Sequence, residues 1–555
     1  MHSLVFALLA MIAQGDSQAV VRWAQRAQAD FELSRRARLP SVEAQPASRC
    51  DPLLGAELIG RFCYWDDGSA SNPPPEPSSI GTLRHRLLQV LDSAAAMLPG
   101  DEWIAGQRVR YLAEDGQTAA ALSAARDCRS TAWWCESLAG FALHAAGESH
   151  AADSAFSAAL GDMPRDERCR WNDLSSLLAD GRLRRGYRKQ TCEEREELEA
   201  RLWWLAQPLL SRPGNDRRVE HYARHTLARM LEHARSPFGL ATGDDLRELI
   251  VRYGWPVAWE QERPRPGEMD RQVVGHDRQP TYHFLPDETG VVAPSTLDPE
   301  RSRELYAPTY AKAFTILEPE IAAFRRGDST LVVAAYDVAQ DTLFRSRPLA
   351  AALVLARGEH DSLVVEQRGV AGPSGVLIAT APWGARLASL EIIDEPRAAG
   401  RGRVALAARD PDSTRVALSD LLFFEPPDSL PGDLAAVLPY VHTATTVPRG
   451  RRLGLYWEVY GLQSGEPAAI SVSVQQRGKG LLRRAAESVG LATTSPPLQL
   501  EWHERMREPA GLAARSLEVD VSTLRPGRYR ITVSVAPTGR KRASASRELH
   551  IVRSR

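Results

Sequence analysis

Two histidines on one predicted helix are the clearest chemical feature of this chain. His221 and His225 are four residues apart and Glu232 follows eleven residues after His221, so a helix would place all three near one face. Two histidines at this spacing can share a metal ion. No glutamate stands between them to act as a base, and no third ligand is identifiable. The sequence therefore assigns no metal site, and a partly solvated helical face is the alternative.

Six cysteines form the second group that could do chemistry, and all of them lie in the first 200 residues. An even number of cysteines is typical of disulfide pairing in an exported protein, although six of them allow fifteen pairings. The sequence has no close pair of cysteines, or of a cysteine and a histidine, of the kind that binds zinc. Six buried free thiols in a cytosolic protein are the alternative to disulfides. Pairing between sequence neighbours is the simplest expectation: Cys50–Cys63, Cys128–Cys135 and Cys169–Cys192.

Catalytic signatures are missing from the sequence. It contains no phosphate-binding glycine loop, nucleophile elbow, zinc-protease helix or calcium loop. We therefore predict no catalytic, cofactor-binding or metal-binding residue. The formal net charge is −1 over 555 residues, which offers no field that would attract nucleic acid.

The N-terminus resembles a signal peptide. An apolar run, 4–13, has the length of the hydrophobic region of such a peptide, and it is too short to span a bilayer. Small residues at Ser17 and Ala19 predict cleavage after Ala19, with 13–15 as a second option. Since no later stretch reaches about 18 apolar residues, we expect no transmembrane span in the mature chain.

A helical pattern extends over 80–235 and contains a repeat. Glycine, alanine, phenylalanine and proline recur there at the spacings of tetratricopeptide repeats: Gly140, Leu143, Gly147, Ala152, Phe156, Ala159 and Pro164. A degenerate copy stands 31 residues earlier, at Leu112, Gly116, Ala121 and Ala125. The region is thus similar to this repeat family, which implies paired helices with a concave surface. A generic alanine-rich hairpin is the alternative.

The segment 202–259 resembles the GWxTD domain of exported bacterial proteins. The matching residues are Trp203, Trp204, Pro208, Asn215, Glu220–Arg224, Gly239, Thr242, Asp244 and Ile250–Gly254. Leu240 replaces the tryptophan of the signature, and Gly243 precedes Asp244. The resemblance implies export and brings no functional residues with it. Physically, Asn215 is a good N-cap for a helix that starts at Asp216 and ends near Ala234, and LIVRYGWP is expected to be a buried strand.

The second half of the chain predicts strands at the spacing of β-sandwiches. We expect one set over 330–338, 351–356, 362–367, 375–380, 387–393, 403–408 and 418–424. A second set is expected over 452–462, 468–476, 498–504, 516–522, 527–536 and 547–552. The proline-rich segment 425–433 is the predicted boundary between them. In LRPGRYRITVSV, Tyr529 and the valines point to one face, like a late strand of an immunoglobulin-like sandwich.

We therefore expect a multidomain α + β protein: a helical, tetratricopeptide-like region and then two antiparallel, immunoglobulin-like β-sandwich domains. The predicted divisions are 1–19 (signal peptide), 20–79 (cysteine-containing segment and proline-rich linker), 80–200 (repeat-like helices), 201–262 (GWxTD-like segment), 263–325 (linker and helix), 326–425 and 434–555 (sandwiches).

The expected function is that of an extracytoplasmic scaffold that binds another protein or an envelope component. Its groove is predicted to be lined by residues such as Trp134, Phe141 and Phe156. The adjacent tryptophans of a helix, Trp133 and Trp134, cannot both face one core, so one of them should lie at a groove or contact. The alternative is an extracytoplasmic hydrolase, whose site would lie near the GWxTD-like segment and would join His221 or His225 to a carboxylate.

Overall fold

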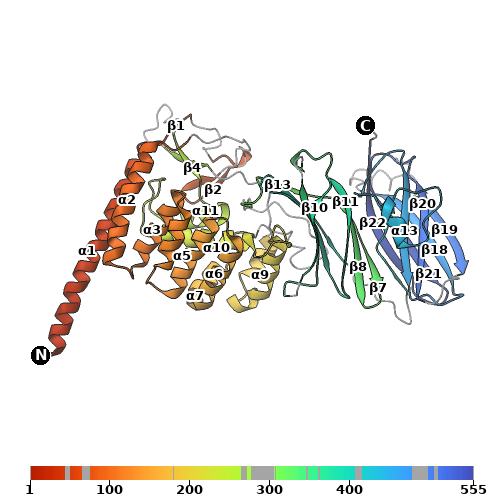
Figure 1. The fold of residues 1–555 in the computed structure, drawn as a ribbon, viewed down its shortest axis with the longest axis horizontal. Helices are drawn as coiled ribbons and strands as arrows, with labels where there is room; N and C mark the ends of the chain where they lie inside the picture. The colour runs from red at the N-terminus through yellow and green to blue at the C-terminus, as the bar shows by residue number, and fades with distance from the viewer. Residues whose placement is uncertain are drawn as a thin grey trace. The chain divides into compact units, whose positions relative to one another are not determined.

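The computed structural model describes residues 2–43, 50–54, 56–64, 75–178, 181–263, 272–276, 306, 308–344, 348–360, 363–406, 416–477, 498–505 and 511–553. It confirms a mixed α + β protein with helices in the first half and β-sheets in the second (Figure 1). The chain forms two compact units. The first contains most of the chain up to Lys312, and the second contains Leu209–Ser211 and Ala313–Arg555.

The first unit is built mainly of helices. They are α1 (His2–Arg36), α2 (Ser78–Met97), α3 (Glu102–Glu114), α4 (Thr118–Arg126), α5 (Ala132–Ala145), α6 (Ser149–Asp162), α7 (Arg165–Trp171), α8 (Gly181–Tyr187), α9 (Cys192–Ala206), α10 (Asp216–Met230) and α11 (Asp244–Tyr253). Short strands join them: β1 (Ser41–Val42), β2 (Glu57–Ile59), β3 (Phe62–Tyr64), β4 (Ala258–Glu262) and β5 (Val273–His276), besides a 3-10 turn at Pro52–Leu54.

Two consecutive helical hairpins, α3–α4 and α5–α6, turn in the same way. Gly116 and Gly147, 31 residues apart, both have a positive φ, at 73° and 81°. Each glycine N–H donates to the carbonyl three residues earlier, and the following N–H donates to the carbonyl five residues back, at 2.9–3.0 Å. Because these bonds satisfy the last carbonyls of the first helix, both turns end that helix in the same conformation.

The pairing of large and small residues also repeats between the hairpins. A Cβ on Gly140 of α5 would lie 2.8 Å from the ring of Phe156 on α6, so the two helices touch through this pair. The equivalent positions of the first hairpin carry Val109 and Ala125, and both of these are buried. The phenylalanine therefore fills the volume that the glycine leaves.

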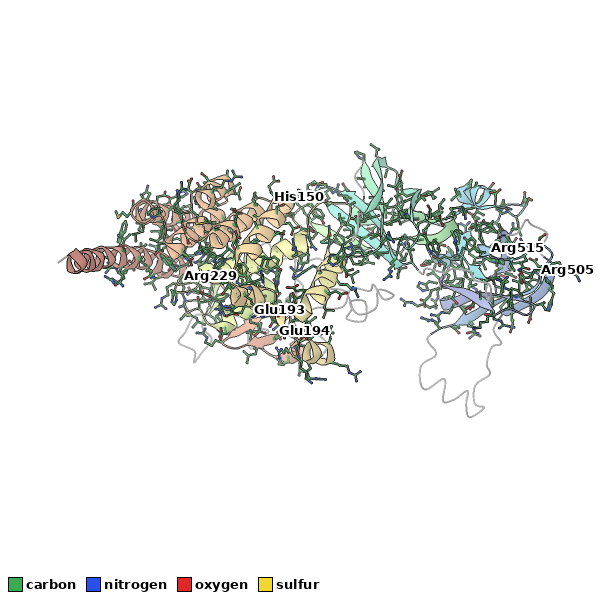
Figure 2. All side chains as sticks on the ribbon, turned by 90° about the horizontal axis from the view of Figure 1, so that it is seen from below. His150, Glu193, Glu194, Arg229, Arg505 and Arg515 are labelled. Atoms are coloured by element: carbon green, nitrogen blue, oxygen red, sulfur yellow. A yellow bond between two sulfur atoms is a disulfide. The ribbon has the colours of Figure 1, made fainter. Side chains whose placement is uncertain are left out.

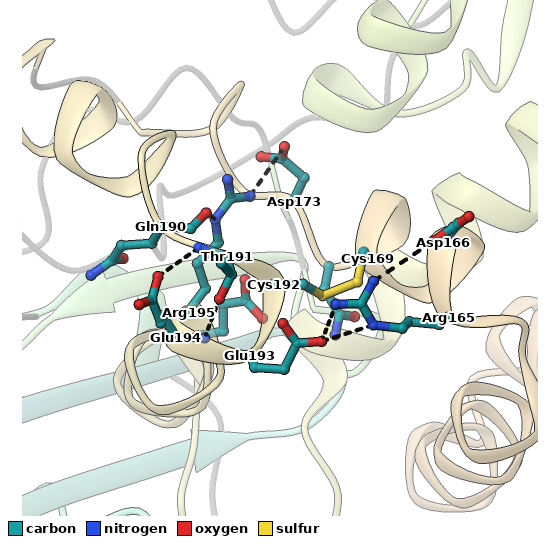
Figure 3. Close-up of a disulfide and its surroundings, with 12 residues drawn as sticks. Arg165, Asp166, Cys169, Asp173, Gln190, Thr191, Cys192, Glu193, Glu194 and Arg195 are labelled. Carbon is teal, nitrogen blue, oxygen red and sulfur yellow. Dashed lines mark hydrogen bonds and ion pairs between the residues drawn. A yellow bond between two sulfur atoms is a disulfide. The ribbon is translucent and has the colours of Figure 1, made fainter.

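Three predicted disulfides are present, and they join sequence neighbours: Cys50–Cys63, Cys128–Cys135 and Cys169–Cys192. The last of them ties α7 to the start of α9 (Figure 3). At that start the Thr191 hydroxyl accepts from the Glu194 N–H and the Glu194 carboxylate accepts from the Thr191 N–H, forming a capping box. Arg165 of α7 pairs with Glu193 at 2.6 Å beside the sulfurs.

Two expectations about secondary structure are wrong. The segment expected as a buried strand is part of α11, because Leu246, Leu249, Ile250 and Tyr253 bury at helical spacing and Asp244 and Asp245 favour a helix N-terminus. The helix expected within 263–325 is replaced by strands over 313–316 and 320–326, and in the second of these Ile321 faces one core while Ala322 and Phe324 face another. Residues 301–305 and 307, most of the connection predicted over 263–300, and 71–74 of the proline-rich linker lie outside the described residues.

The second unit contains two pairs of sheets. The first pair consists of the sheet β10-β9-β12-β13-β6 and the sheet β11-β8-β7. Its strands are β6 (Ala313–Ile316), β7 (Glu320–Arg326), β8 (Ser329–Asp337), β9 (Leu349–Ala356), β10 (Val364–Ala371), β11 (Ser374–Pro382), β12 (Leu387–Asp394) and β13 (Ala398–Ala405). One hydrophobic core fills the space between the two sheets, with residues such as Val332, Leu353 and Leu390 fully buried.

The second pair of sheets shares another core around Trp457 and Ile531. One sheet contains β14 (Ala417–Leu418), β15 (Leu422–Phe424), β17 (Arg452–Tyr460) and β20 (Leu512–Asp520). The other has the order β16-β22-β21-β18-β19. Its strands are β16 (Thr446–Pro448), β18 (Pro467–Gln476), β19 (Leu498–Arg505), β21 (Gly527–Pro537) and β22 (Ala543–Val552).

The boundary expected at 425–433 lies elsewhere. Since β14 and β15 pair with β17, residues 417–424 belong to the second pair of sheets, and the proline-rich segment leads into the short helix α13 (Leu434–Val437). The sheets are also not purely antiparallel, because β6 pairs with β13 and β16 pairs with β22 in parallel.

A buried carboxyl joins the two cores of this unit. The N–H of Phe423 donates to Glu320 at 2.9 Å, and the Arg547 guanidinium lies 3.2 Å from the same carboxyl group. Arg547 also donates to the carbonyls of Ile321 and Leu421. Burial raises the pKa of Glu320 to about 7, although Arg547 opposes this shift.

Candidate cleft in the helical unit

A cavity of about 610 Å³ lies in the first unit. Its walls come from the end of α1, the end of α3, the helices α5 and α10, and the segment 253–259 that follows α11. This volume is within the range of about 300–1,000 Å³ that is usual for ligand sites. We call this cavity the cleft.

The two helical hairpins contribute equivalent positions to the cleft. Ala113 and Glu114 of α3 line it, and so do His144 and Ala145 of α5, which stand 31 residues later. The cleft is therefore formed on the face that the first helix of each hairpin presents. Helical repeats use such a concave face for binding.

An imidazole and a carboxylate meet in the wall of the cleft. The Nε2 of His144 on α5 lies 2.8 Å from the carboxylate of Glu220 on α10. Arg224, one turn later on α10, donates to the other oxygen of Glu220, also at 2.8 Å. The contact is an ion pair when the imidazole is protonated.

Arg224 also fixes the end of α11. Its Nη1 donates to the carbonyls of Val251 and Arg252 at 3.2 and 3.0 Å, where the helix leaves carbonyls without internal partners. The chain then turns at Gly254, whose φ of 91° favours glycine. This turn leads Trp255 into the wall of the cleft.

Aromatic side chains form the apolar part of the wall. Phe141 of α5 and Trp255 are both half-buried, and both line the cleft. Trp255 packs against Trp259 with ring centroids 5.0 Å apart, and Trp259 is buried. The guanidinium carbon of Arg110 lies 5.7 Å from the centroid of the Trp255 ring. These contacts fix the orientation of Trp255 before any ligand binds.

The charged side chains of the cleft neutralise one another. Arg35 lies 3.1 Å from Glu114 and 3.7 Å from Glu76, and Arg84 lies 2.5 Å from Glu76. Burial alone would raise the pKa of Glu114, but Arg110, Arg35 and Arg84 hold it below its ordinary value. The cleft therefore presents an aromatic, polar surface without a large excess of either charge.

The histidines singled out from the sequence do not line the cleft. Asn215 caps α10 as predicted, accepting from the Arg218 N–H at 3.0 Å, but α10 ends at Met230. His221 and His225 point into the core, with ring centroids 4.6 Å apart, and burial lowers the pKa of His225 to about 3 and that of His221 well below its usual range. Among the described residues no cluster could hold a metal ion.

Only one of the three residues expected to line a groove lies in the wall of the cleft. Phe141 lines the cleft, whereas Trp134 and Phe156 are buried, with exposed fractions of 2% and 1%. The expectation that one of Trp133 and Trp134 faces a groove is also wrong. Both are buried, because Trp133 packs against Trp171 and Trp134 packs against Gly106 of α3. The Arg229 guanidinium carbon lies over both rings, 4.8 and 5.1 Å from their centroids. Figure 2 labels Arg229 among the side chains of this unit.

Sequence reasoning missed the contact between His144 and Glu220. The two residues are 76 positions apart, and neither belongs to a catalytic motif. The one signal in the sequence is that His144 stands at the position of the repeat that Ala113 occupies in the earlier copy.

No family model matches the chain, and no curated protein matches it. Among solved structures, it is similar to a red sea bream transglutaminase over 43% of this chain and 32% of that one, with 10% identity and a TM-score of 0.15. It is also similar to Escherichia coli alpha-2-macroglobulin activated by porcine elastase, over 41% of this chain and 22% of that one, with 12% identity and a TM-score of 0.16. The chain thus spans less than a third of the first of these proteins and less than a quarter of the second.

Proposed function

We propose that this chain is an exported bacterial scaffold protein that binds a segment of another polypeptide in the cleft. The observation that carries this proposal is the aromatic, charge-balanced wall that equivalent positions of two helical hairpins build together with Trp255. Half-buried aromatic side chains held by their neighbours are the usual anchors of protein–protein contacts. The expected ligand is a peptide segment with apolar side chains that pack between Phe141 and Trp255.

Repeat packing of the tetratricopeptide kind is part of this proposal. The matching glycine turns of the two hairpins support it. The equivalent packing pairs also support it, since Val109 and Ala125 in the first hairpin correspond to Gly140 and Phe156 in the second. In this interpretation α10 takes the place of the next repeat, since it packs against both α5 and α6. The cleft is then the concave face of a short helical array.

The second unit is proposed to contain immunoglobulin-like sandwiches that act as spacers or docking modules. In the later one, the Tyr529 hydroxyl at the start of β21 donates to the Arg525 carbonyl at 2.8 Å. A tyrosine that bonds back to the chain at such a corner is a hallmark of the immunoglobulin fold. The parallel pairing of β16 with β22 at a sheet edge agrees with this proposal.

Export is supported by the three disulfides, which indicate an oxidising compartment outside the cytoplasm. The described helices include none that is long and apolar enough to cross a membrane. We propose that residues 1–19 are a signal peptide. Among the described side chains of α1, the first buried one is Ala24, so cleavage after Ala19 would leave the core contacts of the helix in place.

The segment 202–259 is proposed to be a variant GWxTD domain. The Thr242 hydroxyl donates to the Leu231 carbonyl at 2.7 Å, which ties the turn to the end of α10. At the position of the signature's tryptophan this chain has Leu240, whose side chain is 37% exposed. The turn therefore buries no aromatic ring at this position.

A hydrolase is the second candidate, and the contact between His144 and Glu220 favours it. A histidine beside a carboxylate can act as a general base. Its site would adjoin the GWxTD-like segment, because Glu220 and Arg224 belong to that segment.

Affinity capture from the native envelope tests the first proposal. The full chain and a Phe141→Ala, Trp255→Ala variant would be used as baits, with Tyr440→Ala, at an exposed aromatic residue of the second unit, as the control. We expect one partner whose recovery falls at least about tenfold with the cleft variant alone. Equal recovery with all three baits would contradict the proposal. For a hydrolase, His144→Gln would keep the partner bound and stop its turnover.

A further inference from the structure

The strand β19 has an unpaired edge. It is the outermost strand of the sheet β16-β22-β21-β18-β19, and no described strand pairs with its outer side. It pairs with β18 in one uninterrupted antiparallel register from Leu498 to Val474 and from Arg505 to Pro467. Such an edge presents free N–H and C=O groups that can bind another strand.

One face of β19 is apolar. Leu498, Leu500 and Trp502 stand opposite Val474, Val472 and Ile470 of β18, which are core residues of the sandwich. The leucines extend this core face outward, yet Leu498 is 46% exposed and Leu500 is 48% exposed. The other face carries Gln499, Glu501 and His503, all of them exposed.

Two other edge strands of the second unit, β10 and β11, carry features that oppose pairing. β10 has an irregular register between Arg368 and Ala371, and β11 ends at Pro382. Bulges and prolines at edges are common devices against strand addition. β19 contains neither proline nor glycine, and Glu504 near its end pairs with Arg515 of β20 at 2.7 Å. Figure 2 labels Arg515 and also Arg505, the last residue of β19.

We propose that β19 pairs with β19 of a second copy of this chain, antiparallel, about a two-fold axis at Leu500. In this register Leu500 faces Leu500 of the second copy, and Leu498 faces Trp502. The apolar side chains would then form one row across four strands. Its members are Val472 and Leu500 of one copy, followed by Leu500 and Val472 of the second copy. On the opposite face Gln499 meets Glu501, so no like charges stand opposite each other.

Neighbouring registers are less favourable. An axis at Glu501 would place two glutamates directly opposite each other, which destabilises a strand pair. An axis between Glu501 and Trp502 is excluded, because it would oppose Leu500 and His503, which lie on opposite faces of β19, whereas opposed residues of an antiparallel pair share one face. The axis at Leu500 keeps the leucines and Trp502 on one face without opposing like charges, and it gives a closed and symmetric contact that forms no fibre.

Single cysteines test the register. The native cysteines are all in disulfides, so an introduced cysteine is the one free thiol of the full chain. Leu500→Cys is expected to form a cross-linked dimer under mild oxidation, because its partner stands directly opposite. Leu498→Cys, at nearly equal exposure, is the matched control. Its thiols would be about 13 Å apart in this register, too far for a disulfide. No cross-link at residue 500, or equal cross-linking of both variants, would overturn the proposal.

Sedimentation equilibrium of the unmodified full chain provides the second measurement. A dimer that dissociates on dilution is expected, and Leu500→Arg should weaken it at least about tenfold because two arginines would meet at the axis. Val370→Arg on β10, where the valine is 75% exposed, should leave it unchanged. A monomer at all concentrations, or a dimer insensitive to Leu500→Arg, would contradict the pairing. A complex of β19 with a different protein in place of the dimer would also overturn it.

Discussion

Gly140 and Phe156 are in direct contact between α5 and α6, at a place where a Cβ on the glycine would lie 2.8 Å from the ring. In the preceding hairpin the equivalent residues are Val109 and Ala125, so a large residue opposes a small one in both, with the order reversed. Because a large residue meets a small one in each hairpin, two different sequences can build the same hairpin. The volume of the pair sets the distance between its two helices.

Gly140→Ala should therefore destabilise the first unit. The methyl group would push Phe156 out of its position, and overpacking of this kind costs about 1–3 kcal/mol. Gly161→Ala on α6 is the matched control, because nothing lies within 4 Å of a Cβ there. It should be neutral or stabilise by up to about 1 kcal/mol, since alanine favours a helix. Urea unfolding followed by circular dichroism measures both variants, and equal stability of the two would refute the contact.

Reciprocal exchange provides a rescue. Gly140→Val together with Phe156→Ala recreates the pair of the first hairpin, and it should be more stable than Gly140→Val alone. An additive loss in the double variant would mean that the two positions do not share one volume.

Glu320 makes the stability of the second unit depend on pH. Burial raises its pKa from 4.5 to about 7, so the unfolded chain ionises first as the pH rises. Stability from this group is complete below about pH 4.5 and is lost as the pH rises toward 7, by about 3 kcal/mol at most. Glu320→Gln should flatten this part of the curve, because the amide keeps an acceptor for the Phe423 N–H. Denaturant unfolding from pH 4.5 to 8 measures the difference, and parallel curves for the two proteins would exclude the effect.

The disulfide between Cys169 and Cys192 should stabilise the first unit by closing a loop between residues 23 positions apart. Chain entropy predicts a loss of about 3 kcal/mol in a Cys169→Ser, Cys192→Ser variant. The Cys128–Cys135 bridge, with a separation of 7, should contribute less. Thermal unfolding of the two double variants gives the comparison. A larger loss at the shorter loop would show that effects other than chain entropy dominate.

Processing of the N-terminus can be checked directly. If residues 1–19 are a signal peptide, mass spectrometry of the protein recovered from the envelope should find a mature chain that begins at Val20. Ala19→Arg should block this cleavage, because the processing site requires a small residue. A chain that begins at Met1 after export would refute this assignment.

Local features of the fold could be predicted from the sequence. The short loops favoured pairing of neighbouring cysteines, and period-two alternation located strands such as 468–476 and 527–536. The run LIVRYGWP was misjudged, because consecutive apolar residues suit a buried strand and a buried helix equally well. The helical spacing of Leu246, Leu249, Ile250 and Tyr253 becomes visible only when the segment is extended back to Leu246.

The cleft could be predicted only in part. Phe141 follows from the repeat, but the contact of His144 with Glu220 depends on how α5 packs against α10. Likewise, Arg224 binds the carbonyls of Val251 and Arg252 only because α11 ends beside α10. The sequence drew attention to His221 and His225 instead, since helical spacing alone does not tell which face of α10 is buried.

Photo-cross-linking from the cleft tests the central claim most directly. With p-benzoylphenylalanine in place of Phe141, irradiation of the native envelope should produce adducts with one defined segment of another polypeptide. The same substitution at Val370, a residue exposed on the second unit, should not produce them. Adducts from position 141 that match those of the control site, or no adduct at all, would contradict a binding role for the cleft.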